Sequence, residues 1–141
     1  MLYFEKKKRG DFVSKFHIRQ VKSGLKFDLR AGNGEIIAVS ESYTSPASCR
    51  KGIESIRLCA VRAALEDQTA PENREKCPKF QLYTDKRGQF RFRLLAANGK
   101  IIAVSEGYTT KAACLNGIDS VRVNAPTAEI ETQSDDHLGG K

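Results

Sequence analysis

The sequence predicts an α+β fold in which two tandem β-β-β-α-β repeats share one antiparallel sheet. Three observations support this prediction. Residues 27–60 match residues 92–125 without a gap, with 20 identities in 34 positions. Each copy contains runs with the period-two alternation of strands, and each continues into a run with the 3.6-residue period of a helix. A match of this extent indicates an internal duplication.

The strands are clearest in the second copy. Residues 80–83 and 90–94 alternate apolar and polar side chains, and residues 85–88 break the chain between them. Asn98 and Gly99 then separate two strand-like runs, a strong hairpin signal because both residues of such a turn tolerate positive φ. Residues 101–106 form the third expected strand. Upstream of residue 27 the offset between the copies changes from 65 to 64, so one residue differs in the first turn region.

A helix is expected after the third strand of each copy. Ser45 with Pro46 in the first copy and Thr110 in the second are typical helix starts. One apolar stripe per helix has the spacing i, i+4, i+7, namely Cys49, Ile53 and Ile56, and Cys114, Ile118 and Val121. Each helix also contains a glycine, which costs about 1 kcal/mol against alanine. We therefore expect the helix backbone to rest directly on the sheet at both positions.

Short fourth strands are expected at residues 62–66 and 127–131, with a polar linker between the copies. Units this small rarely bury enough surface alone. The two copies are therefore expected to share one core across a pseudo-twofold axis, as a monomeric pseudo-dimer. The expected segments are a basic N-terminal segment (1–14), repeat 1 (15–66), a linker (67–78), repeat 2 (79–131) and a polar tail (132–141).

The formal net charge of +7 is concentrated at the start of the chain, where residues 1–26 carry +6. Clustered cations are the electrostatic mark of nucleic-acid binding. Short charge runs are more often simply solvated. The candidate nucleic-acid residues are Lys6, Lys7, Lys8 and Arg9, acting with Lys15, Arg19, Lys22 and Lys26.

Cysteine and histidine usage argues against a metal site. The four cysteines are 10, 18 and 37 residues apart, and His17 and His137 are the only histidines. Closely spaced ligand pairs of the zinc type are absent. No metal and no cofactor are expected. Since nothing in the sequence indicates a signal peptide, a membrane span or a disulfide framework, we expect a cytoplasmic protein.

Polar residues kept by both copies at the junction of third strand and helix are the best site candidates. One hypothesis makes them two symmetric binding sites, with an arginine one helix away as anchor for an anionic ligand. The structural alternative, which we favour, has the tyrosine pack on the helix start while serine and glutamate satisfy helix amides. The candidates are Ser40, Glu41, Tyr43 and Arg57, and Ser105, Glu106, Tyr108 and Arg122.

The pattern Asn-Gly-x-Ile-Ile-Ala-Val-Ser-Glu-x-Tyr, followed by Cys-x-x-Gly-Ile-x-Ser, occurs twice. It resembles the YegP-like family of small bacterial proteins of unknown function. The resemblance implies that each repeat supplies three antiparallel strands, a helix and a last strand. It also implies that two repeats, or two single-repeat subunits, build one sheet and exchange their last strands. It brings no reaction, cofactor or catalytic residue.

No catalytic constellation is visible, so the first functional hypothesis is a non-enzymatic binding or interaction module. Its partner is not identified by the sequence, and a protein partner is one possibility. Nucleic-acid association through the basic N-terminal segment is the second hypothesis. A small-ligand binder or an unrecognised enzyme at the paired Ser/Glu/Tyr positions is the third.

Overall fold

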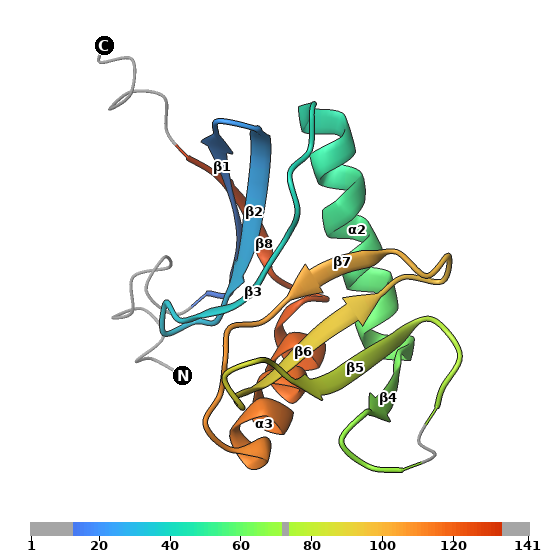
Figure 1. The fold of residues 1–141 in the computed structure, drawn as a ribbon. Coiled ribbons are helices and arrows are strands. Elements are labelled where there is room, and N and C mark those ends of the chain that lie inside the picture. Colours follow the sequence, from blue (N-terminus) through green and yellow to red (C-terminus); the bar gives the residue numbers. More distant parts are fainter. Residues whose placement is uncertain (1–12, 72–73, 134–141) are drawn as a thin grey trace, which may run out of the picture.

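The computed structural model describes residues 13–71 and 74–133 (Figure 1). The described chain contains eight strands and two helices in the repeated order that the sequence predicts. The elements of the first repeat are β1 (Lys15–Val21), β2 (Gly24–Arg30), β3 (Ile36–Val39), α2 (Pro46–Arg62) and β4 (Ala64–Asp67). Those of the second are β5 (Lys79–Thr84), β6 (Phe90–Leu95), β7 (Ile101–Val104), α3 (Lys111–Asn124) and β8 (Glu129–Thr132).

All eight strands form one sheet in the order β4-β5-β6-β7-β3-β2-β1-β8. The two repeats meet at its centre, where Val39 of β3 pairs with Val104 of β7. The last strands are exchanged, because β4 pairs with β5 of the second repeat and β8 pairs with β1 of the first. These two pairings are parallel, so the sheet is mixed rather than purely antiparallel as expected. Parallel pairing requires the chain to return to the same end of the sheet before the second strand begins, and the stretches between β4 and β5 and between β1 and β8 are long enough for this.

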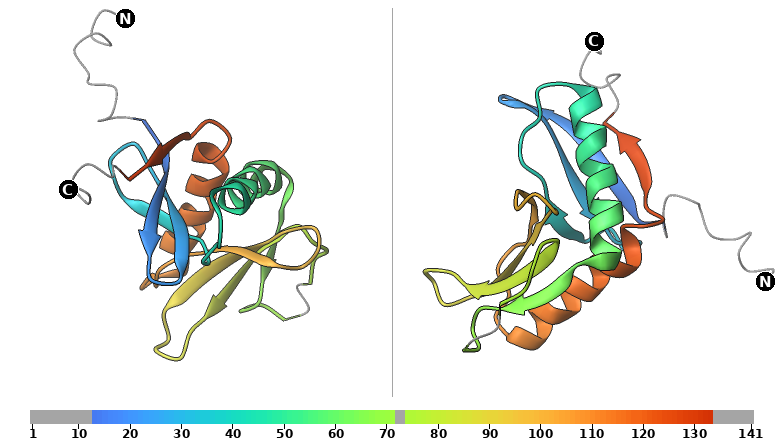
Figure 2. Two further views of the ribbon diagram at one scale, coloured as in Figure 1. Left: turned by 90° about the horizontal axis from the view of Figure 1, so that it is seen from above. Right: turned by 90° about the vertical axis from the view of Figure 1, so that its right-hand side faces the viewer.

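Both helices pack on the same face of the sheet, and each covers strands from both repeats. Helix α2 contacts β2, β6 and β7, whereas α3 contacts β3, β5 and β6. The sheet is bent at its centre, and the helices lie in the angle between its two halves (Figure 2). The expected stripes of both helices are fully buried, and four phenylalanines from the strands fill the space beneath them, Phe16, Phe27, Phe80 and Phe92. The shared core is therefore made of both repeats.

The helix starts match the sequence prediction. Ser45 caps α2 by accepting a hydrogen bond from Ser48 N, and Thr110 caps α3 by accepting one from Ala113 N. Side-chain oxygens at this position satisfy amides that have no partner within the helix.

The hairpins at Asn33-Gly34 and Asn98-Gly99 are one residue longer than the tight two-residue turn expected. Gly99 N donates to Ala96 O at 2.8 Å and Ala96 N donates to Lys100 O at 2.8 Å, which closes a loop over residues 97–99. Gly99 has a φ of 86°. A three-residue loop of this kind needs positive φ at its last position, which the glycine supplies.

The helix-free face of the sheet carries the polar residues of the alternating strands. Since Phe16 and Ile18 of β1 and Phe27 and Leu29 of β2 face the helices, their neighbours in the chain face away from them. In β1 and β2 these outward residues are Lys15, His17, Arg19, Lys26, Asp28 and Arg30.

Candidate functional site

The two junction serines are structural. Ser40 Oγ accepts a hydrogen bond from Phe27 N at 2.9 Å and donates one to Glu41 O at 2.8 Å. Ser105 Oγ makes the same pair of contacts with Phe92 N and Glu106 O, at 2.9 and 2.8 Å. Both serines are buried. They satisfy strand backbone groups and do not cap the helices, which corrects the structural alternative weighed above. The reason is that both hydroxyls are held against the neighbouring strand, ahead of the residues that begin each helix.

The acidic partners of these serines point away from them. The side chains of Glu41 and Glu106 are exposed. Each contributes only its backbone carbonyl to the serine hydroxyl. The adjacency of serine and glutamate in both repeats therefore does not bring the two side chains together.

Each junction tyrosine packs its ring between a phenylalanine of the second strand and a helix glycine. The Tyr43 ring stacks on Phe27 with centroids 5.9 Å apart. A Cβ atom added to Gly52 would collide with the Tyr43 hydroxyl, and one added to Gly117 would lie 2.5 Å from the Tyr108 hydroxyl. The prediction that these glycines rest directly on the sheet is wrong for Gly52, where all three contacts are with Tyr43, whereas a Cβ atom at Gly117 would also lie 3.0 Å from the Phe92 ring of the sheet. The tyrosine lies between helix and sheet, and glycine makes room for it.

Burial raises the pKa of both phenols. Desolvation is the main cause, and nearby acidic groups add to it, Glu41 beside Tyr43 and Glu35 with Glu106 beside Tyr108. Both tyrosines are therefore protonated at neutral pH and can donate a hydrogen bond.

Arg57 and Arg122 join the repeats at the far ends of the helices. Arg122 Nη1 donates to Ala60 O at 3.2 Å and to Ala63 O at 2.8 Å, and its guanidinium lies 4.8 Å from the centre of the Phe80 ring. Arg57 Nη2 donates to Ala128 O at 2.5 Å. Arg122 of α3 thus binds the C-terminal end of α2, and Arg57 of α2 binds the segment that follows α3.

The arginines do not lie beside the junction residues of their own repeat. Arg57 is eleven residues after Pro46, the first residue of α2, and a rise of 1.5 Å per residue places them roughly 16 Å apart along the axis. The eight predicted site residues therefore form separate structural clusters and not two compact sites.

A cavity of about 270 Å³ lies between the first repeat's β2–β3 hairpin and α3 of the second repeat. Tyr108 is the only predicted site residue in its wall. The other polar groups of the wall are Glu35, Asn116 and Ser120, which sequence reasoning missed. At the equivalent positions of the other half, Lys100 replaces Glu35 and Lys51 replaces Asn116. The pairing of a hairpin with the other repeat's helix is a tertiary contact that no single-copy pattern encodes.

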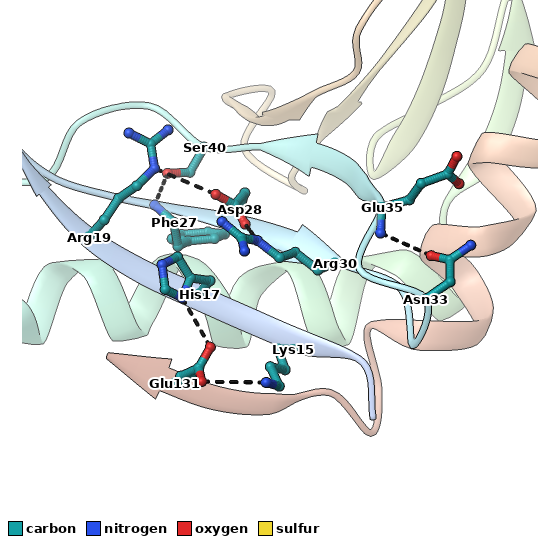
Figure 3. A network of polar contacts seen from close by, with 10 residues as sticks. All are labelled: Lys15, His17, Arg19, Phe27, Asp28, Arg30, Asn33, Glu35, Ser40 and Glu131. Carbon is teal, nitrogen blue, oxygen red and sulfur yellow. Dashed lines mark hydrogen bonds and ion pairs between the residues drawn. The ribbon is translucent and has the colours of Figure 1, made fainter. Parts of the chain in front are cut away.

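A polar network occupies the helix-free face of β1, β2 and β8 (Figure 3). Glu131 of β8 lies 3.1 Å from His17 Nδ1 and 3.4 Å from Lys15 Nζ. Asp28 of β2 pairs in register with His17 and contacts two arginines, Arg30 Nε at 2.6 Å and Arg19 Nε at 3.5 Å. Only Lys15 and Arg19 of this network were candidates from the sequence.

The second repeat has a counterpart of this network with different chemistry. Glu66 of β4 accepts hydrogen bonds from Lys79 Nζ at 2.7 Å, from Glu75 N at 2.8 Å and from the side-chain amides of Gln68 and Gln81 at 2.9 Å each. The Lys79 hydrogen bond is the main cause that lowers the pKa of Glu66 to about 2. Where β2 has Asp28, β6 has Arg93, which donates to Gln81 at 2.6 Å.

The cysteines of the two helix stripes, Cys49 and Cys114, are not activated for chemistry. All four cysteines of the chain are unpaired. Burial raises the pKa of Cys49, and it raises that of Cys114 to about 11. A thiol with a raised pKa carries little thiolate at neutral pH and is a weak nucleophile. Within residues 13–71 and 74–133, no group of three His, Cys, Asp or Glu side chains is arranged to hold a metal ion.

The candidate nucleic-acid residues Lys6, Lys7, Lys8 and Arg9 lie outside the described residues. Of the cations expected to act with them, Lys15, Arg19 and Lys26 lie on β1 and β2, and Lys22 lies in the turn between these strands. No helix in the described part of the chain is long and apolar enough to cross a membrane.

These features define a two-repeat α+β protein whose halves complete one sheet by exchanging their last strands. The chain belongs to the family described as a domain of unknown function (DUF1508), which matches residues 24–67 and again residues 85–131. The resemblance to the YegP-like family is thereby confirmed.

Three relatives illustrate the family. A UPF0339 protein of Pseudomonas aeruginosa is 33% identical over 123 residues, covering 86% of this chain and 99% of that protein. A UPF0339 protein of Treponema denticola is 60% identical over 52 residues, which is 37% of this chain and 90% of that protein, so it has the length of one repeat. The solution NMR structure of yegP from Escherichia coli, a protein of unknown function, has a TM-score of 0.70 at 32% identity, covering 86% of this chain and 94% of that one.

Proposed function

We propose that this protein is a non-enzymatic binding module that contacts the phosphate backbone of nucleic acid through the helix-free face of β1 and β2. The observation that carries the proposal is the set of cations on this face, Lys15, Arg19, Lys26 and Arg30. Contacts to phosphates supply most of the affinity in sequence-independent nucleic-acid binding.

The balance of charge on this face favours an anionic partner. Asp28 is 1% exposed and already contacts two arginines. Glu131 contacts Lys15 and His17. The side chains of Arg19 and Arg30 are about one third exposed, at 36% and 34%. On β1 and β2 positive charge therefore reaches solvent while the aspartate does not, which supports attraction of a polyanion, and the exposed negative charge of Glu131 lies at the edge of the face on β8.

On the helix-free face of the second repeat, two cations each contact both a carboxylate and a backbone carbonyl. Arg91 binds Asp85 and the Ser105 carbonyl, and Lys79 binds Glu66 and the Glu75 carbonyl. The first repeat is therefore the proposed contact half, and it directly follows the basic residues 6–9 in the chain.

The non-enzymatic part of the proposal is supported by the engagement of the side chains that could act as nucleophiles or bases. Ser40 and Ser105 donate to backbone carbonyls, and His17 is engaged by Glu131. The unpaired cysteines fit the cytoplasm as the proposed compartment. A turnover that depends on Ser40 or Glu41 would contradict the non-enzymatic proposal.

Fluorescence anisotropy with a labelled 20-base-pair duplex, over a salt series from 25 to 200 mM, tests the proposed function. Three full-length variants are compared with the parent chain. The face variant is Lys26→Gln with Arg30→Gln, and the helix control is Arg50→Gln with Lys51→Gln on the exposed side of α2. The segment variant replaces residues 6–9 with glutamine.

The face variant is expected to bind about tenfold more weakly at 100 mM salt, with a salt slope smaller by roughly 1 to 2. The helix control loses the same charge and is expected to change affinity less than threefold. Equal losses in both variants would mean that net charge alone drives binding. No binding by the parent chain at 25 mM salt, or a loss confined to the segment variant, would refute the proposed contact face.

Small-ligand binding is a second candidate, favoured by the cavity that Tyr108, Glu35, Asn116 and Ser120 line. A carboxylate beside a protonated phenol suits a small ligand that carries an ammonium group. Ligands that bind only the native state raise the melting temperature. A stabilising amine should therefore lose its effect on Glu35→Gln, whereas no shift from any amine in a broad metabolite pool would argue against this candidate.

A further inference from the structure

Asp28 is an unusual residue for the outward side of a strand. It is 1% exposed, and its Oδ2 atom has no hydrogen-bond partner within the described chain. A buried carboxylate is costly unless its oxygens are paired and hydrogen-bonded. The second arginine, Arg19, approaches Oδ2 at 3.5 Å without making a hydrogen bond. The carboxylate is therefore only partly satisfied in the unbound protein.

The fold itself does not require an aspartate at this position. In the second repeat Arg93 occupies the equivalent place in the sheet, pairing in register with Gln81 as Asp28 pairs with His17. The flanking positions also differ, since Tyr83 stands where the first repeat has Arg19 and Leu95 stands where it has Arg30. The group Arg19, Asp28 and Arg30 is thus a feature of the first repeat alone.

The contacts of Asp28 fix how the two arginines are presented. Asp28 meets both guanidinium groups at Nε, the nitrogen nearest the chain. No terminal nitrogen of either arginine is used in a hydrogen bond or ion pair within residues 13–71 and 74–133. Within this part of the chain each terminal pair is therefore unused, and the two guanidinium groups lie around one carboxylate (Figure 3). Planar guanidinium groups bind phosphate oxygens in a bidentate manner, which lysine cannot do.

We propose that Arg19 and Arg30, positioned by Asp28, bind one phosphate group together. The inference rests on the proposed function, and it names these two arginines as the main phosphate contact of the face. Lys26, which pairs in register with Arg19, adds charge beside them. The same chemistry would accept a phosphate from a nucleic-acid backbone or a free phosphate, so the test has one arm for each source.

Two variants separate positioning from charge. Asp28→Asn removes a negative charge, so charge alone predicts tighter duplex binding, whereas loss of positioning predicts weaker binding. Arg19→Lys with Arg30→Lys keeps the net charge, so charge alone predicts no change, whereas loss of bidentate contacts predicts weaker binding. Arg50→Lys on α2 is the matched control. Far-UV circular dichroism checks folding, and the arginine-to-lysine variant decides alone if Asp28→Asn does not fold.

We expect Asp28→Asn to bind the labelled duplex about three- to tenfold more weakly, the double lysine variant about tenfold more weakly, and Arg50→Lys as the parent does. In the second arm, inorganic phosphate is titrated while NMR follows the Arg19 and Arg30 Nε–H signals. Duplex binding that is unchanged in the double lysine variant, or tighter in Asp28→Asn, overturns the phosphate site but leaves the proposed face.

Failure of the parent chain to bind duplex refutes the proposed function while the phosphate site can still stand. The phosphate site then stands only if two conditions hold. Inorganic phosphate must shift the Nε–H signals of Arg19 and Arg30, and the double lysine variant must bind inorganic phosphate more weakly than the parent chain. If neither duplex nor phosphate binds, the phosphate site is refuted as well.

Discussion

Glu66 lies on the exchanged strand β4 and receives four hydrogen bonds at its two carboxylate oxygens. Lys79 Nζ and Glu75 N donate to Oε1, and the side-chain amides of Gln68 and Gln81 donate to Oε2. The change we consider is Glu66→Gln. It keeps the size of the side chain but removes the charge and places an NH₂ group against donors. We expect it to reduce the free energy of unfolding at pH 7 by about 2–4 kcal/mol.

The same hydrogen bonds lower the pKa of Glu66, so the stabilisation depends on pH. A fall from the ordinary 4.5 to about 2 is worth about 3 kcal/mol at 1.36 kcal/mol per unit. Because the folded-state pKa is the lower one, this stabilisation is present above pH 4.5 and is lost as the pH falls from 4.5 towards 2. The Glu66→Gln variant lacks this titrating carboxylate. Its free energy of unfolding should therefore fall less than that of the parent chain as the pH falls through this range.

The measurement is urea denaturation at pH 7 and pH 3, followed by far-UV circular dichroism because the chain has no tryptophan. Glu131→Gln is the matched control, since Glu131 is the equivalent residue of the other exchanged strand but is 46% exposed. An exposed pair contributes about 0–1 kcal/mol. Equal losses for Glu66→Gln and Glu131→Gln, or an unchanged difference between pH 7 and pH 3 in Glu66→Gln, would refute the reasoning.

Three further changes test the packing of the repeats. Gly52→Ala should reduce the free energy of unfolding by about 1–3 kcal/mol, because the new methyl group collides with the Tyr43 hydroxyl. Tyr43→Phe should recover part of this loss in a double-mutant cycle, and an absence of coupling would argue against the collision. Ser105→Ala leaves the buried Phe92 N without its acceptor, which should reduce the free energy of unfolding by about 1–3 kcal/mol. Hydrogen exchange at the Phe92 amide should become faster, and unchanged exchange would contradict the role of the serine. Arg122→Met removes two hydrogen bonds to the end of α2 and should lower the melting temperature by roughly 5 °C or more, whereas an unchanged melting point would mean that these bonds contribute nothing.

The architecture could be predicted from the sequence because its signals are local. The apolar stripe of each helix and the caps at Ser45 and Thr110 depend on residues within a few positions of one another. Because the pattern is repeated in the sequence, the same elements could be assigned in both copies. The exchange of last strands came from the family resemblance, and the pairings of β4 with β5 and of β8 with β1 confirm it.

The role of Gly52 could not be predicted, because the side chain that fills the space belongs to Tyr43, nine residues away. The burial of Glu66 was missed for a similar reason, since its main partner Lys79 lies beyond the linker. Asp28 and Arg30 look like ordinary outward residues of an alternating strand. Only the register with β1 brings Arg19 close to the same carboxylate. Contacts across strands therefore set the limit of what this sequence reveals about its candidate sites.

The strand exchange has a consequence for the order in which the protein folds as it is synthesised. Glu66 of β4 meets Lys79 of β5 across 13 residues of chain, whereas Glu131 of β8 meets His17 of β1 across 114. At 5–20 residues per second, β1 waits roughly 6–23 s after synthesis for its outer partner. During this time one edge of β1 has unpaired backbone groups, a template for pairing with another chain. The nascent protein is thus most exposed to misassembly at its first strand, until its last strand arrives.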